Sequence, residues 1–304
     1  MYAYPQLSSK DFIYFRFLGE GLGNLLFPWA RAVSAARQFQ LTPVWPAWTQ
    51  IKIGPILRRE PDKRFYHDLF TCPRGYVNGL TKLGILLSNP HLPETALDKG
   101  VGTRVENAVI RFSGMNGFFQ RFLDDYAFVG QELVRMTRDE HKRGLEFDFT
   151  RSISVHIRLG DFSVPSSADH LRSDTYRLPI AWYVSAIAKL RAELGAGHDV
   201  YVFSDGTNTE LSEVLQLKNT HRLDFGSSIA DLLALSRANI LVASGSTFSM
   251  WASYVGRMPV LWYPGRLRQP LYFDNPGGEI EFHPDTDLGQ SFLALTAKAS
   301  TLNR

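Results

Sequence analysis

The clearest pattern of apolar and polar positions lies in the middle of the chain, in the stretch RSISVHIRLGDF, residues 151–162. Apolar residues alternate there with Ser154, His156 and Arg158. A period of two predicts a strand with one apolar face and a second face that carries His156 and Arg158. Gly160 ends this strand, and Asp161 follows in the turn. The pattern therefore predicts a guanidinium and an imidazole at the carboxyl end of a strand, where open α/β sheets bind ligands.

The rest of the second half alternates short apolar runs with amphipathic segments. Strands are predicted at 199–204, 221–225, 239–243 and 259–263, and helices at 179–193, 207–217, 229–237 and 247–255. Strands that alternate with helices specify a parallel, doubly wound sheet.

The first half is less regular. Residues 12–18 (FIYFRFL) read as a buried first strand, and a glycine loop at 19–24 leads into a helix at 25–40 with Asn24 as its N-cap. The loop is a poor match to a dinucleotide fingerprint, and the chain has no P-loop. Residues 41–105 predict variable loops, with an acceptor-facing surface as the alternative. A strand at 107–112 and a helix at 122–142 complete this half, so we expect domains at 1–150 and 151–304.

Composition excludes several classes of protein. The 304 residues are 44% hydrophobic and 21% charged, with a net charge of +3, which predicts a globular protein without a nucleic-acid footprint. Cys72 is the single cysteine, so we expect no internal disulfide and a reducing compartment. We expect neither a signal peptide nor a membrane span.

Three predicted loops of the second half leave the carboxyl ends of strands and can face one ligand: 159–162, 204–207 and 244–247. Asp205 can accept hydrogen bonds from a base or ribose, and Ser246 and Thr247 open a helix whose N–H groups can hold a phosphate. Each feature taken alone is also typical of an ordinary turn or helix cap. Likewise, His156 can be a structural histidine, and Arg158 can be an ion-pair partner of Asp161.

Five segments together resemble the α-1,2-fucosyltransferase family. They are GLGN at 21–24 with Phe27, GFFQ at 117–120, HIRLGDF at 156–162, FSD at 203–205, and DLLALS at 231–236 followed by ASGSTFSMWA at 243–252. They occur in the order of the family motifs G-L-G-N-Q-x-F-Q, G-[YF]-[FW]-Q, H-x-R-R-G-D-[YF], F-S-D-D and D-x-x-L-M-S … A-N-S-[ST]-F-S-W-W-[AG]. The chain departs from these motifs at Leu159, where the family has a second arginine, and at Gly206, where it has a second aspartate. Leu25 and Pro28 also stand where the family has glutamine, and Gly245 and Met250 replace an asparagine and a tryptophan.

The resemblance implies a GT-B fold, with two Rossmann-like doubly wound domains facing a cleft. The second domain would bind GDP-fucose, and the first would mostly shape the acceptor side. By this carry-over, Arg158 binds the diphosphate with support from His156, and Asp205 contacts the guanosine. Ser246, Thr247 and Phe248 line the phosphates, and Gly23 and Asn24 close over the nucleotide from the first domain.

The implied reaction is an inverting transfer of fucose to a hydroxyl of an oligosaccharide or lipid-linked glycan. Departure of GDP develops negative charge that Arg158 and a helix N-terminus can stabilise, so no metal is expected. Asp285-Thr286-Asp287 has D-x-D spacing but reads as a solvated loop. The base remains open between Asp161, Asp124 and His156.

This interpretation places the enzyme in surface polysaccharide or oligosaccharide synthesis in the cytoplasm, with peripheral contact to the inner face of the membrane as a further option. Two alternatives stay open: the same fold with another nucleotide-sugar donor, which Leu159 and Gly206 motivate, and a non-catalytic nucleotide- or glycan-binding protein. The acceptor, the linkage and the oligomeric state are not predicted.

Overall fold

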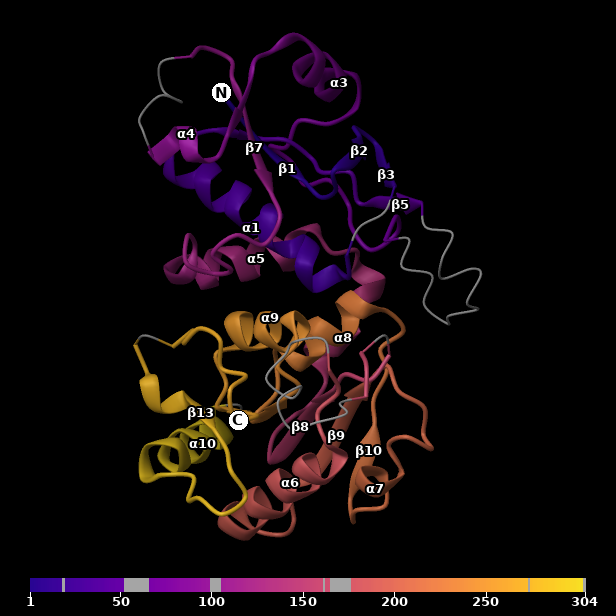
Figure 1. Ribbon diagram of the computed structural model, residues 1–304, viewed down its shortest axis with the longest axis vertical. Coiled ribbons are helices and arrows are strands. Elements are labelled where there is room, and N and C mark those ends of the chain that lie inside the picture. Colours follow the sequence, from indigo (N-terminus) through magenta and orange to yellow (C-terminus); the bar gives the residue numbers. More distant parts are fainter. Residues whose placement is uncertain are drawn as a thin grey trace. The chain divides into compact units, whose positions relative to one another are not determined.

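The structure, a computed structural model, describes residues 1–17, 20–51, 66–98, 105–160, 162–164, 176–272 and 274–302. The chain divides into two compact units, Met1–Asp139 and Glu140–Arg304 (Figure 1). This division comes before the expected boundary at 150/151, because the 3-10 turn η4 (Arg143–Glu146) packs against the second unit. A Cβ atom on Gly144 would lie only 2.4 Å from Cβ of Ala234, so this close approach needs glycine.

The first unit is built on a four-stranded parallel sheet in the order β4-β1-β7-β6. Its strands are β1 (Tyr2–Gln6), β4 (Thr42–Pro43), β6 (His91–Pro93) and β7 (Val109–Ser113). Its helices are α1 (Leu22–Gln38), α3 (Gly79–Ser88), α4 (Thr95–Asp98) and α5 (Tyr126–Met136), with the 3-10 turn η2 (Leu123–Asp125). The 3-10 turn η3 (Asp139–His141) spans the division between the units. Ala3 and Ile110 pack with the α1 side chains, and Tyr4 and Val109 pack with Leu86 of α3, so helices cover both faces of the sheet.

The predicted first strand at 12–18 is wrong. The buried first strand is β1, whereas the aromatic run forms β2 (Lys10–Phe12) and β3 (Phe15–Phe17), which pair with β5 (Thr49–Ile51) in a separate small sheet. Phe12, Phe15 and Phe17 are exposed and pack on one another. The buried side chain in this hairpin is that of Arg16, which donates to the Ala47 carbonyl and to Gln50.

Helix α1 also begins earlier than predicted. Gly21 is its N-cap, so Asn24 lies inside the first turn and the prediction of Asn24 as N-cap is wrong. Pro28 is tolerated within the helix, where it removes only the N–H that would have bonded to the Asn24 carbonyl. Helix α5 is shorter than the predicted helix at 122–142, because 3-10 turns flank it on both sides.

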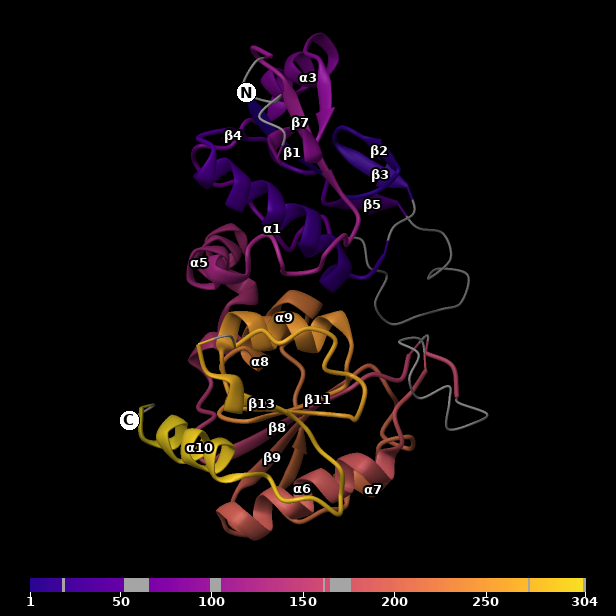
Figure 2. The same ribbon diagram turned by 60° about the vertical axis from the view of Figure 1, so that its left-hand side comes forward.

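The second unit contains a six-stranded parallel sheet in the order β10-β9-β8-β11-β12-β13. Figure 2 labels its strands β8, β9, β11 and β13. Its strands are β8 (Ser152–Ile157), β9 (Asp199–Ser204), β10 (Thr220–Arg222), β11 (Leu241–Ala243), β12 (Val260–Trp262) and β13 (Glu279–Glu281). Its helices are α6 (Ile180–Leu194), α7 (Ser212–Leu215), α8 (Ser228–Leu235), α9 (Thr247–Gly256) and α10 (Gln290–Leu302), with the 3-10 turn η6 (Pro276–Gly278).

Numbered along the chain, these strands lie in the order 3-2-1-4-5-6, which is typical of Rossmann folds. The chain reverses direction across the sheet between β8 and β11, and this switch point is where such folds bind ligands. The predicted parallel, doubly wound sheet is therefore confirmed, although β13 and α10 were not predicted.

Strand β8 is the central element, and all six of its residues are buried. The apolar side chains of Ile153, Val155 and Ile157 enter the core with α6. The opposite face, with His156, turns toward α9 rather than toward solvent. The predicted alternation is thus confirmed, and the polar face of this strand is also buried, because helices cover both sides of a central parallel strand.

No helix among the described residues is long and apolar enough to cross a membrane.

Candidate functional site

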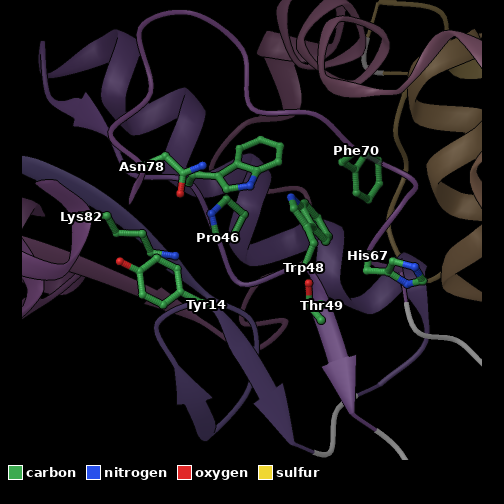
Figure 3. Close-up of a pocket in the computed structure, with 9 residues that line it drawn as sticks. Tyr14, Pro46, Trp48, Thr49, His67, Phe70, Asn78 and Lys82 are labelled. Atoms are coloured by element: carbon green, nitrogen blue, oxygen red, sulfur yellow. The ribbon is translucent and has the colours of Figure 1, made fainter. Parts of the chain in front are cut away.

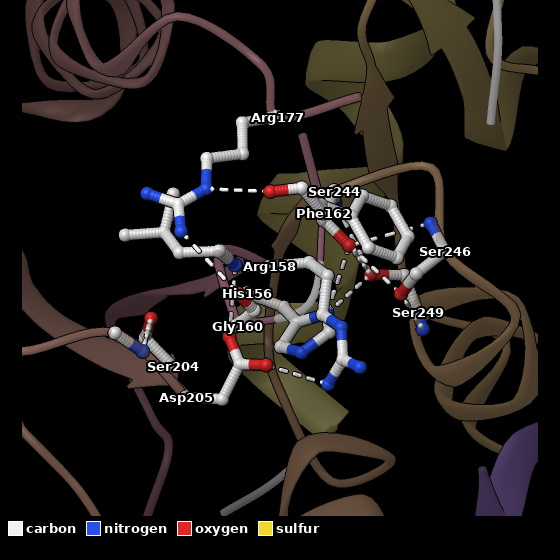
Figure 4. A network of polar contacts seen from close by, with 12 residues as sticks. His156, Arg158, Gly160, Phe162, Arg177, Ser204, Asp205, Ser244, Ser246 and Ser249 are labelled. Atoms are coloured by element: carbon white, nitrogen blue, oxygen red, sulfur yellow. Dashed lines mark hydrogen bonds and ion pairs between the residues drawn. The ribbon is translucent and has the colours of Figure 1, made fainter. Parts of the chain in front are cut away.

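A polar network gathers at the carboxyl ends of β8, β9 and β11, on both sides of the switch point (Figure 4). His156 and Arg158 come from β8 and its following loop, Asp205 from the loop after β9, and Ser244 and Ser246 from the loop after β11. The second unit thus brings together the three loops that the sequence assigned to one ligand site.

The His156 ring is held by serine hydroxyls. Its Nδ1 atom lies 2.7 Å from Oγ of Ser249 and 3.0 Å from Oγ of Ser244. Ser244 Oγ also donates to Ser246 Oγ at 2.9 Å, and the Ser244 N–H donates to Ser249 Oγ at 3.1 Å. Phe248 packs on the imidazole with ring centroids 4.8 Å apart. His156 therefore fixes the loop after β11 and the first turn of α9 to the end of β8.

Burial keeps His156 neutral. Desolvation lowers the pKa of His156 to about 4; the nearby Asp205 carboxylate acts in the opposite direction, and Arg158 adds to the lowering. A neutral imidazole near pH 7 contributes hydrogen bonds to the network rather than charge.

Asp205 orients Arg158. Its Oδ2 lies 2.6 Å from an Nη atom of Arg158, and its Oδ1 accepts a hydrogen bond of 2.8 Å from the Leu159 N–H. The guanidinium also lies over the Phe162 ring, 5.4 Å from its centroid. About a quarter of the Arg158 side chain remains exposed (26%), so the guanidinium is oriented by Asp205 and still accessible to a ligand. Arg158 thus pairs with Asp205, whereas Asp161, its alternative partner, lies outside the described residues.

Two glycines permit this close packing. A Cβ atom on Gly160 would lie 2.2 Å from Oδ2 of Asp205, and one on Gly206 would lie 2.5 Å from Cδ1 of Leu159. Leu159 is buried, so the second contact is also tight. Two of the positions that depart from the family motifs, Leu159 and Gly206, therefore lie against each other.

The amino terminus of α9 provides the other half of the site. Ser246 is the N-cap, and its side chain accepts a hydrogen bond from the Ser249 N–H. Thr247 and Phe248 occupy the first turn, where backbone N–H groups and the helix dipole favour an anion. Gly245 adopts a positive φ of 74° immediately before this cap, a conformation that glycine adopts without strain.

The sequence interpretation missed two arginines beside this loop. Arg266 is buried, and its side chain packs where a Cβ atom on Gly245 would lie 3.0 Å from it. Arg268 donates to the Gly245 carbonyl at 3.3 Å. Both arginines follow β12 in the segment PGRLR, residues 264–268, and their position after a predicted strand was the signal that could have identified them.

An apolar cavity of about 350 Å³ adjoins the loop after β8. Leu159, Leu178 and Ile180 contribute apolar walls, and the ion pair between Arg177 and Glu210 forms part of its rim. Leu159 thus presents apolar surface where the family motif would place a second guanidinium.

The remaining predicted site residues belong to the first unit. Gly23 and Asn24 are in the first turn of α1. Nearby, Phe27 packs on Phe119 with ring centroids 4.9 Å apart, so the GLGN and GFFQ segments meet within the first unit.

The general base and the metal question remain predictions. Of the three candidate bases, His156 is buried with Nδ1 engaged, Asp124 lies in η2, and Asp161 is outside the described residues. Asp285 and Asp287 lie in an exposed loop, as expected, and Asp287 pairs with Lys189 at 3.0 Å. The described residues contain no cluster of three or more His, Cys, Asp or Glu side chains that could hold a metal.

We expect His156→Asn to change how stability depends on pH. The folded-state pKa of His156 is depressed, so the unfolded chain binds the proton first, and wild-type stability falls as pH drops from about 6.5 toward about 4. The variant lacks this component, so its free energy of unfolding relative to wild type should rise as pH falls through that window. Burial raises the pKa of Asp231 to about 7, but this contribution is common to both proteins and cancels.

Urea unfolding at several pH values between 4 and 8 measures this difference. His221→Asn, at an exposed histidine of the same sheet, is the matched control and should show no such trend. A pH-independent difference between wild type and His156→Asn would rule out a buried neutral imidazole.

A six-stranded parallel sheet with an arginine and a helix N-terminus at its switch point is an arrangement typical of nucleotide-binding α/β units. The family model for glycosyl transferase family 11 matches residues 107–258, half of the chain. The chain belongs to this family, which confirms the predicted resemblance, and it is a glycosyltransferase.

Solved structures agree on the fold. The crystal structure of NodZ alpha-1,6-fucosyltransferase soaked with GDP-fucose is 15% identical, with a TM-score of 0.53 over 82% of this chain and 94% of that chain. The selenomethionine form of the fucosyltransferase NodZ from Bradyrhizobium is 14% identical, with a TM-score of 0.51 over 82% and 93%. The predicted GT-B type of fold, with two Rossmann-like units, is confirmed. No curated protein sequence matches the chain.

Proposed function

We propose that this glycosyltransferase moves fucose from GDP-fucose to a hydroxyl of a glycan acceptor, with inversion at the sugar carbon. The observation that carries this proposal is the convergence of Arg158 and the amino terminus of α9 at the switch point of the second unit. Membership of glycosyl transferase family 11 and the shared fold with NodZ, whose crystals were soaked with GDP-fucose, support the choice of donor.

In the proposed reaction the acceptor oxygen attacks C1 of fucose while the bond from C1 to the β-phosphate oxygen breaks. The bonding electrons leave with GDP, and the acceptor proton passes to a base. Arg158 is held by Asp205 before the donor arrives, so it can stabilise the developing charge with little reorganisation. The N–H groups of Thr247 and Phe248 at the start of α9 would bind the same phosphates.

The other predicted residues take supporting roles in this proposal. His156 positions α9 through Ser249 and Ser244. Arg158 and the Leu159 N–H already bind the two carboxylate oxygens of Asp205. Asp205 therefore contacts the guanosine portion only through the remaining lone pairs of those oxygens. Gly23 and Asn24 close over the nucleotide from the first unit, and no metal takes part.

Leu159 is relevant to which sugar the donor carries. The apolar cavity that it lines suits the methyl group of a 6-deoxy sugar such as fucose. The same replacement of an arginine by leucine also supports the alternative, a different sugar on GDP. We further propose α-1,2 linkage, a role in surface glycan synthesis, and a cytoplasmic location with peripheral membrane contact.

GDP is expected to raise the melting temperature more than UDP, ADP or CDP does. At about 100 times its Kd, GDP should add about 2.7 kcal/mol of stability. For a cooperative unit of about 150–250 residues, this corresponds to roughly 5–10 °C in Tm. If no nucleotide raises the melting temperature, the transferase proposal is wrong. If UDP raises it more than GDP does, the donor is a UDP-sugar and the protein is still a glycosyltransferase.

A further inference from the structure

A second candidate site lies in the first unit. A pocket of about 200 Å³ is bounded by β5, the segment before it, the hairpin turn and the start of α3 (Figure 3). Its walls include Tyr14, Trp45, Trp48, Thr49, His67 and Asn78. Drug-sized ligands occupy cavities of about 300–1,000 Å³, so this pocket suits a smaller molecule, about the size of one sugar ring.

Aromatic rings form a fixed wall of the pocket. The Trp45 and Trp48 rings are 6.4 Å apart at an interplanar angle of 65°, and Trp48 packs on Phe70 at 4.3 Å. Tyr76 packs edge-to-face on Trp45, with ring centroids 5.8 Å apart. Trp48 is buried, but Trp45 is partly exposed, so part of its indole surface remains accessible. Rigid indole surfaces can pack on the apolar C–H face of a pyranose ring with little loss of conformational entropy.

Polar side chains in the pocket can still form hydrogen bonds with a ligand. Asn78 is the N-cap of α3, yet its side chain makes no capping hydrogen bond, and its carboxamide interacts with the Cys72 thiol. The indole N–H of Trp48 is buried and has no acceptor among the described residues. Thr49 and Asn78 thus add a hydroxyl and an amide to the aromatic wall, which matches a ligand that carries both apolar faces and hydroxyl groups.

The charge in the pocket is already compensated. Lys82 is only 1% exposed, and its ammonium donates to the Ile13 carbonyl and lies 5.6 Å from the Tyr14 ring centroid. Asp11 and Lys82 stabilise each other's charged forms, so the positive charge has an internal counterion. The pocket therefore offers hydrogen bonds rather than an unbalanced cation, which favours a neutral ligand over an anionic one.

We infer that this pocket binds the pyranose ring of a neutral sugar through Trp45, with Asn78 and Thr49 as hydrogen-bonding partners. The assignment of that sugar to the acceptor glycan rests on the proposed function. The binding chemistry itself rests only on the pocket.

Saturation-transfer difference NMR with methyl glycosides tests this inference. The probes are the neutral methyl glycosides of galactose, glucose, mannose and N-acetylglucosamine, with methyl glucuronide and guanosine as comparison ligands. At least one neutral glycoside should receive saturation from the protein. Trp45→Ala should weaken its binding about tenfold, and Trp45→Phe, which keeps an aromatic surface, should weaken it less. Phe39→Ala removes a partly exposed ring at the end of α1, outside the pocket, and should leave binding unchanged.

GDP affinity is measured on every variant and should match wild type, and melting curves check that each variant is folded at the temperature of the binding assay. Failure of all neutral glycosides to bind, equal binding by Trp45→Ala, or preferred binding of methyl glucuronide or guanosine would overturn the inference. GDP binding without sugar binding would contradict this inference alone. Sugar binding that depends on Trp45, without GDP binding, would contradict the proposed function and still support the pocket as a sugar site.

Discussion

Replacing Arg158 by alanine is expected to lower kcat/KM by one to two orders of magnitude, or about 1.5–3 kcal/mol of transition-state stabilisation. The guanidinium is held by Asp205 at 2.6 Å and remains partly exposed at the switch point, where the leaving diphosphate would gain negative charge. Steady-state kinetics with GDP-fucose and a glycan acceptor measure the effect. Arg158→Lys should recover only part of the activity, because an ammonium cannot bind two oxygens in the plane of a guanidinium.

The matched control is Arg191→Ala. Arg191 also donates to backbone carbonyls of the second unit, those of His198 and Lys218, but these lie before β9 and β10, at the opposite edge of the same sheet. Its loss should lower stability without changing kcat/KM. Equal effects of the two substitutions on turnover, in folded proteins, would refute the role of Arg158.

Gly160→Ala is expected to lower kcat/KM nearly as far as Arg158→Ala does, although it adds only a single methyl group. That carbon would lie 2.2 Å from Oδ2 of Asp205, and the carboxylate cannot yield without leaving Arg158 or the Leu159 N–H. Gly160 has no positive φ, so the substitution acts through this contact and not through backbone strain.

A double-mutant cycle separates this mechanism from general damage. In an Asp205→Ala background the clashing oxygen is absent, so adding Gly160→Ala should cost little further activity. Gly197→Ala, at a loop glycine with open space around its Cα, is the control and should behave like wild type. Additive losses in the cycle would contradict the account.

The sequence predicted the second unit better than the first. His156, Arg158, Asp205 and Ser246 could be placed together because parallel strands end at one edge of a sheet, and the structure does bring them together. The family motifs, however, did not reveal that Leu159 and Gly206 touch, because that contact joins two loops far apart in the chain. Arg266 and Arg268 were missed for the same reason: their partners lie on the loop after β11.

The errors in the first unit have local physical causes. FIYFRFL and YAYPQ are both short runs with aromatic residues, and a proline is unusual in a central strand, yet β1 with Pro5 is the strand that pairs on both sides. Asn24 is a good N-cap residue by type, but the helix begins at Leu22 and takes Gly21 as its cap. Strand β13 has the sequence EIE, which carries almost no apolar signal, so only its pairing with β12 reveals it.

A crystal structure of the protein with GDP shows directly whether the switch point of the second unit binds the diphosphate. We expect diphosphate oxygens within hydrogen-bonding distance of the Arg158 guanidinium and of the N–H groups of Thr247 and Phe248, with His156 still bonded to Ser249. A diphosphate bound away from the carboxyl ends of β8 and β11, or one that leaves Arg158 paired with Asp205 alone, would contradict it.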